Sequence, residues 1–165
     1  MIDLQIAYID YSLNTRSIDV FVNGCNGNCK GCCNPEIKDW SVKGMSIYKA
    51  IDKVESLNND FNKLVDKIII VGGDPVDAYD KNPEDLLFML HNIKNKTSKP
   101  IYLFTRHKLD DVSQNIKNIV DYIKVGEYLP ELTVDNNIQF GIKLATSNQK
   151  IYKKLDNEWR LENEL

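Results

Sequence analysis

Long apolar runs and an excess of positive charge are both missing from this 165-residue sequence. No apolar stretch approaches the ~18 residues that a membrane-spanning helix needs. The first ten residues also lack the basic start and apolar centre of a signal peptide. The formal net charge is -3, and the lysines are scattered rather than clustered as in proteins that bind a phosphate backbone. We therefore expect a cytoplasmic protein that binds neither membranes nor nucleic acid.

Cysteine is scarce as well, and its placement is unusual. All four cysteines fall within residues 25–33, in the segment "GCNGNCKGCCNPE", which also holds three of the eight glycines. In a reducing compartment, cysteines this close together are more often metal ligands or reactive thiols than disulfides. Metal binding is therefore the first hypothesis for this segment.

The rest of the sequence alternates strand and helix patterns. Runs rich in β-branched residues predict strands at 2–9, 17–23, 67–71, 100–104 and 121–125. Apolar residues at helical spacing predict helices covering 47–57, 86–93 and 112–120. The run 68–71 is apolar at every position, which suits a strand covered on both faces in a parallel sheet. We predict an α/β fold in a single domain, residues 1–165, with 155–165 as a short helix or a loose polar tail.

The cysteine spacing indicates an iron-sulfur site. Cys25, Cys29 and Cys32 form a C-x3-C-x2-C pattern directly after the strand predicted to end near Asn23. Ligands of α/β proteins bind at the carboxyl ends of such strands. Three thiolates would leave one iron of a 4Fe-4S cluster without a protein ligand and open to chemistry. Electron-transfer clusters, by contrast, usually have four cysteine ligands. A structural zinc site, which normally takes two separated pairs of ligands, and a redox dithiol remain as alternatives.

A second motif, Gly72-Gly73-Asp74-Pro75, follows the most apolar predicted strand. Taken alone it is also ordinary turn chemistry. If the two strands are neighbours in a parallel sheet, both motifs face the same crevice. Backbone groups of the glycines could then bind the ammonium or carboxylate of a ligand, and Asp74 could offset the charge of a bound amino group.

These motifs resemble those of the radical S-adenosylmethionine enzymes, and among them the family that activates anaerobic ribonucleoside-triphosphate reductases. The similar segments are 14–36, 71–75, 102–112 and 146–151, which span nearly the whole chain in order. The resemblance implies an incomplete parallel βα barrel of the radical S-adenosylmethionine type. The chain departs from the family where Arg106 and His107 replace the usual glycine and aromatic residue, and where Ala145 and Thr146 replace glycine and serine.

The resemblance also implies roles for individual residues. Three would ligate one 4Fe-4S cluster per chain: Cys25, Cys29 and Cys32. Eight would bind S-adenosylmethionine, either around its amino-acid part or elsewhere in the same pocket: Gly31, Cys33, Asn34, Gly72, Gly73, Asp74, Pro75 and Thr105. No general acid or base is required beyond the cluster and the cofactor.

The activity implied is reductive cleavage of S-adenosylmethionine, with an electron from a low-potential donor, to generate a glycyl radical on the reductase. We expect exposed apolar groups near the mouth of the site, Trp40 and Tyr128, to contact that partner. One alternative is a radical enzyme that acts on a small molecule, such as a 7-carboxy-7-deazaguanine synthase. Another is a non-catalytic module that holds a structural metal or an electron-transfer cluster.

Overall fold

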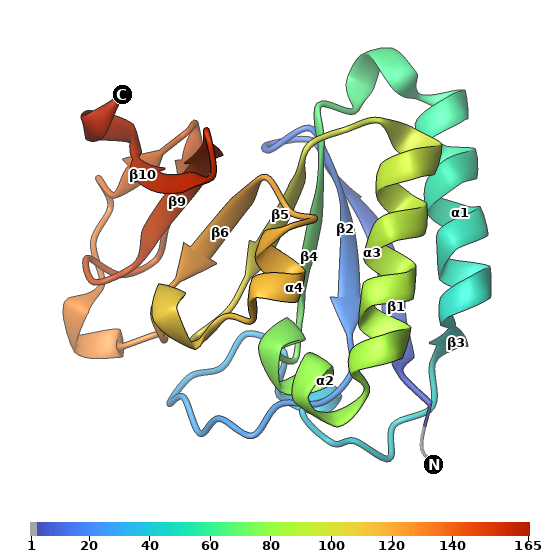
Figure 1. Cartoon of the computed structure of the whole chain (residues 1–165). Helices are drawn as coiled ribbons and strands as arrows, with labels where there is room; N and C mark the ends of the chain where they lie inside the picture. The colour runs from blue at the N-terminus through green and yellow to red at the C-terminus, as the bar shows by residue number, and fades with distance from the viewer. Residues whose placement is uncertain (1–2) are drawn as a thin grey trace.

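One large mixed sheet organises the chain in the computed structural model, which describes residues 3–165. Its eight strands follow the order β10-β9-β6-β5-β4-β2-β1-β3 (Figure 1). The bounds are β1 Gln5–Ser12, β2 Ser17–Val22, β3 Met45–Ser46, β4 Lys67–Gly72, β5 Ile101–Phe104, β6 Tyr122–Val125, β9 Lys150–Leu155 and β10 Glu158–Leu161. The central strands β2, β4, β5 and β6 are parallel, and the strands on both sides of them are antiparallel.

The helices cover one face of this sheet (Figure 1). They are α1 Ile47–Asp60, α2 Pro75–Lys81, α3 Pro83–Thr97 and α4 Gln114–Lys117. Helix α1 begins where the Ser46 hydroxyl accepts a hydrogen bond from the Lys49 amide, which satisfies one of the free amides of the first turn. Within the described chain no helix has both the length and the apolar character to cross a membrane.

Alternation along the central strands divides the core into two clusters. Ile68 and Ile70 point to the helices and join the larger cluster, whereas Ile69 and Val71 point to the opposite face. On that face a smaller cluster forms against the segment of the short hairpin β7 Ile138–Gln139 and β8 Ile142–Lys143. Fully burying one isoleucine stabilises the fold by ~1.5–3 kcal/mol, so the repeated buried positions of β4 fix its register.

The α/β prediction is confirmed in its elements, with three differences. Strands β2, β4, β5 and β6 and helices α1 and α3 lie where the patterns predict them. Strand β1, however, begins at Gln5 and pairs antiparallel with β2. The helix expected over 112–120 is only four residues long, although its apolar side chains are buried as predicted. Residues 155–165 are not a loose tail, because β10 pairs with β9 and a single 3₁₀ turn, Glu162–Glu164, follows it.

The sheet topology brings the two sequence motifs to one edge of the molecule. Strands β2 and β4 are parallel neighbours that end at Val22 and Gly72 respectively. The long segment between β2 and α1 runs beside the start of α2 at the lower edge of the view (Figure 1). The edge that carries the cysteines therefore also carries the glycine-rich end of β4.

Candidate metal centre at the cysteine loop

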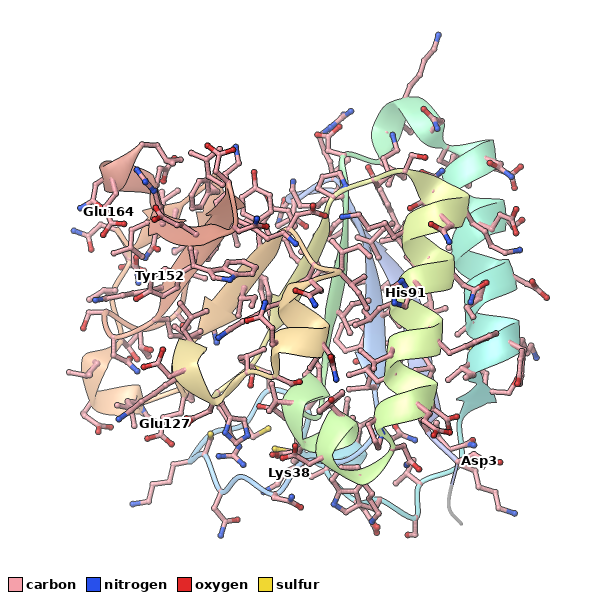
Figure 2. All side chains as sticks on the ribbon, viewed as in Figure 1. Asp3, Lys38, His91, Glu127, Tyr152 and Glu164 are labelled. Carbon is pink, nitrogen blue, oxygen red and sulfur yellow. The ribbon has the colours of Figure 1, made fainter. Side chains whose placement is uncertain are left out.

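The cysteine loop, residues 23–34, follows β2 directly. All four cysteines are free thiols, and the sulfur-bearing loop lies at the lower edge in Figure 2, between the labels of Lys38 and Glu127. Cys25, Cys29 and Cys32 are half-buried, whereas Cys33 is exposed. Gly24 and Gly31 adopt φ values of +94° and +71°, a region that glycine enters without the steric strain of a side chain.

The thiols are not spaced for a single zinc ion. Four sulfurs around one zinc stand about 3.8 Å apart, given zinc–sulfur bonds of about 2.3 Å. In residues 3–165, the one group of three candidate ligands whose atoms all lie within 4.8 Å of one another is Asp74, Asp77 and His107, and it contains no cysteine. His91 is exposed on α3, well away from the loop (Figure 2). A preformed zinc site built on the cysteines is therefore not favoured.

Main-chain bonds and one tryptophan hold the start of the loop. The amides of Gly24 and Cys25 donate to the carbonyls of Ile37 and Lys38, at 2.8 and 3.1 Å. The Trp40 ring covers Gly24 so closely that a Cβ there would lie 2.1 Å from its Cε3 atom. The Trp40 Nε1 donates to Asn26 Oδ1 at 3.1 Å. Trp40, expected to be exposed for a partner, is half-buried and supports the loop instead.

The glycines of β4 pack directly against this loop. The Gly73 amide donates to the Val22 carbonyl, and the Asp74 amide donates to the Gly24 carbonyl, each at 2.8 Å. A Cβ on Gly73 would stand 2.1 Å from the Gly24 oxygen, and one on Gly72 would stand 2.5 Å from the Val22 nitrogen. Contact between the two motifs therefore requires glycine at both positions, independently of any ligand.

Asp74 is committed to contacts inside the protein. Its side chain is 2% exposed and accepts hydrogen bonds from the Thr105 hydroxyl at 2.8 Å and from the amides of Arg106 and Val76, each at 2.9 Å. Burial raises the pKa of Asp74, and these donors oppose the rise. The carboxylate expected to offset a ligand's amino group thus joins the ends of β4 and β5 and caps α2, while Pro75 is buried in the first turn of α2.

A second acidic residue, Asp77, escaped the sequence analysis. It lies on α2 and is 3% exposed. It accepts from the Asn26 amide at 2.8 Å, from Arg106 Nη2 at 3.0 Å, and lies 2.7 Å from His107 Nε2. Burial alone would raise the pKa of Asp77, but these hydrogen bonds hold it below its usual value. The departures at 106 and 107 were the available signal, since two adjacent cationic or polar side chains need a partner.

The remaining predicted residues lie in the loop itself or border it. A Cβ on Gly31 would touch the ring of Tyr128, which is half-buried rather than exposed. Asn34 Oδ1 accepts from the Tyr8 hydroxyl at 3.3 Å, and Tyr8 stacks on Phe21 with ring centroids 4.2 Å apart.

Lys124 places a cation on the sheet face opposite the helices. Its neighbour Ile123 points to the helix side, so Lys124 points to the opposite face, like Phe104. Burial lowers the pKa of Lys124 to about 8, and the negative charges of Asp74, Cys29 and Cys33 counteract this. An anion placed beside Lys124 would offset the cost of burying its charge.

Comparison with known proteins agrees with this arrangement. The family described as "4Fe-4S single cluster domain" matches residues 15–152, which include all four cysteines and the glycines of β4. No solved structure gives a significant match.

Several curated relatives share one name, anaerobic ribonucleoside-triphosphate reductase-activating protein. The Escherichia coli K12 protein is 30% identical over 141 residues, which cover 81% of this chain and 85% of the relative. The Haemophilus influenzae protein is 28% identical over 118 residues, covering 68% and 74% respectively, and the Salmonella typhimurium protein is 30% identical over 119 residues, covering 68% and 75%. From the matched family and these relatives, the chain belongs to the 4Fe-4S single cluster domain family, together with the anaerobic ribonucleoside-triphosphate reductase-activating proteins.

Proposed function

We propose that this chain is a radical S-adenosylmethionine activase that generates a glycyl radical on an anaerobic ribonucleoside-triphosphate reductase. One observation carries the proposal: a C-x3-C-x2-C loop at the end of a central parallel strand touches the Gly-Gly-Asp-Pro end of the next strand. The shared name of the similar proteins, and the large share of each chain over which they are similar, support the choice of reaction and of partner.

The residues fit a 4Fe-4S cluster with one open iron. Cys25, Cys29 and Cys32 would hold it, because they are free, half-buried and carried by one loop whose glycines allow tight turns. Cys33 is exposed and would not ligate. When bound, the cluster and S-adenosylmethionine would supply one-electron reductive cleavage of a carbon–sulfur bond of that cofactor, with the electron coming from an external donor.

The strand ends around the loop would hold S-adenosylmethionine. Five of the expected residues would line the pocket: Gly31, Cys33, Asn34, Gly72 and Gly73. Asp74, Pro75 and Thr105 would act mainly by fixing the strand ends, because their polar groups are already bonded inside the protein. Lys124 would bind the carboxylate of the cofactor, since it is a half-buried cation on the sheet face opposite the helices and is close enough to Cys29 and Cys33 to be influenced by their charge.

The face of the sheet opposite the helices would form the interior of an incomplete βα barrel. The stacked pair Tyr8 and Phe21 lies on this face, next to Asn34, and would border the opening through which a glycine-bearing loop of the reductase reaches the cofactor. A side chain that excludes water there protects a radical from quenching. The residues of this chain would therefore bind, orient and shield, while a low-potential donor supplies the electron.

The decisive experiment is anaerobic. Protein reconstituted with iron and sulfide should reduce with dithionite and convert S-adenosylmethionine to 5′-deoxyadenosine. Incubation with an anaerobic reductase should then give a glycyl doublet in electron paramagnetic resonance. A colourless protein that contains zinc, or cleavage of the cofactor with no doublet on any reductase tested, would contradict the proposal.

Two cysteine variants are matched controls for the ligand set. Cys29→Ala should lose most of its iron, because it removes one of three ligands, whereas Cys33→Ala should keep most of it, because this thiol is exposed. Iron per chain, measured after identical reconstitution, distinguishes them. Equal loss in both variants would refute the assignment of ligands.

A further inference from the structure

Arg106 is the residue at the site that neither the cluster ligands nor the cofactor pocket accounts for. It follows Thr105 at the end of β5, and its Nη2 atom donates to both carboxylate oxygens of Asp77, at 3.3 and 3.0 Å. Asp77 in turn accepts from the Asn26 amide of the cysteine loop. The guanidinium is thus held against the loop by a carboxylate that also holds the loop.

The Nε atom of Arg106 is buried and has no hydrogen-bond acceptor among residues 3–165. The carboxylate oxygen Asp74 Oδ2 is 3.9 Å from this atom, too far for a hydrogen bond. A buried donor without an acceptor is costly, so native proteins rarely retain one. The protein by itself therefore supplies no acceptor for this atom.

The cysteine loop places a sulfur beside this donor. A Cβ on Gly27 would stand 2.5 Å from Arg106 Nε and 3.2 Å from Cys25 Sγ, so both atoms border the same small space. The Gly27 amide already donates to Cys25 Sγ at 3.2 Å. A thiolate at Cys25 would thus have two donors facing it.

We propose that Arg106 tunes the cluster: its Nε–H donates a hydrogen bond to the sulfur of Cys25, or to the sulfide next to it, and so raises the reduction potential of the cluster. The inference rests on the proposed function, because it assumes that Cys25 binds a cluster. Hydrogen bonds to the sulfurs and local charge set the potentials of iron-sulfur clusters, and each donor favours the reduced, more negative state. Since Asp77 balances the charge of Arg106, the directed Nε–H is the main contribution.

The test is a redox titration of reconstituted protein followed by electron paramagnetic resonance of the reduced cluster. In Arg106→Gln the ratio of reduced to oxidised cluster at a fixed potential should fall about tenfold, which is ~59 mV for a one-electron couple. Arg106→Lys keeps a positive charge but not the Nε–H, and its potential should shift in the same direction by less. The matched control is Arg16→Gln, which removes the exposed arginine paired with Asp66 at the other end of β2. A shift in Arg106→Gln no larger than in Arg16→Gln would overturn the proposal.

A second measurement uses the unmodified protein, so it does not depend on a variant that folds. The sequence has three arginines, Arg16, Arg106 and Arg160, and only Arg106 is at the loop. With ¹⁵N-labelled arginine, pulsed electron paramagnetic resonance should show weak coupling between the electron spin of the reduced cluster and an arginine nitrogen. Absence of that coupling would also overturn the proposal. If the unmodified chain instead assembles no cluster, the proposed function fails. If a cluster forms and cleaves the cofactor, but neither its potential nor its nitrogen coupling depends on Arg106, only this inference is refuted.

Discussion

Replacing Gly73 with alanine tests whether the Gly-Gly sequence is required by the fold itself. The added methyl would stand 2.1 Å from the Gly24 oxygen and 2.6 Å from its carbonyl carbon, and both belong to main chain that cannot rotate away. Overpacking of this kind costs about 1–3 kcal/mol. Displacing the loop would also strain the hydrogen bonds from the Gly73 and Asp74 amides, each contributing about 1 kcal/mol. We expect a loss of roughly 2–4 kcal/mol in the free energy of unfolding.

The assay is thermal unfolding of the protein without cluster or cofactor, so ligand binding cannot contribute. For a chain of this size 1 kcal/mol corresponds to about 2–4 °C, and Gly73→Ala should therefore lower the melting temperature by roughly 4–16 °C. The control is Gly141→Ala, where no atom lies within 4 Å and only the φ of +75° is unfavourable, at about 1–2 kcal/mol. A Gly73 variant at least as stable as the Gly141 variant would refute the packing explanation and leave a ligand as the reason for glycine.

Three further predictions concern single side chains. Burial, and to a smaller extent the negative charge of Asp10 opposite it, raise the pKa of Asp19, although the Ser17 hydroxyl donates a hydrogen bond to this carboxylate. The charged form of Asp19 is therefore unfavourable in the folded protein at neutral pH. Asp19→Asn should increase the free energy of unfolding at pH 7, and urea titrations should show the gain vanishing below about pH 4, where both states are protonated. Trp40→Ala should speed alkylation of the thiols in the cluster-free protein, whereas Trp159→Ala on β10 should not; equal rates would contradict the role given to Trp40. Lys124→Met should weaken equilibrium binding of S-adenosylmethionine about tenfold and Lys124→Arg much less, and unchanged affinity in the Met variant would exclude a contact with the carboxylate.

The central elements could be predicted because their signals are local. Strand β4 is apolar at four consecutive positions, and α1 carries buried residues at helical spacing, so burial alone specifies each. Strand β9 has a single buried side chain, Ile151, among lysines and a tyrosine, and β10 has none. Strand β9 forms because it pairs with β6, a contact between distant segments that no local pattern records, and β10 pairs in turn with β9.

The candidate site divides in the same way. The spacing of the cysteines and their place after a strand pointed to the loop, because ligands of one cluster must be close in sequence or in space. The Asp77–Arg106 pair joins residues 29 positions apart and exists only because α2 and the end of β5 meet over the loop. The sequence holds each half of this pair, but charged residues on a short helix and after a strand are ordinary surface features. Only their burial gives them a role.

The same contacts decide which variants can report on the cofactor. Gly73 and Asp74 join the ends of β2, β4 and β5 through their amides and the Asp74 carboxylate, so any change there moves the cysteine loop as well as the pocket. Loss of S-adenosylmethionine binding in such a variant therefore does not show contact with the cofactor. The side chain of Lys124 makes one hydrogen bond, to the Gly126 carbonyl, and that of Cys33 is exposed, so neither side chain holds strand ends together. Weaker binding at these two positions, with iron content unchanged, is what would locate the cofactor.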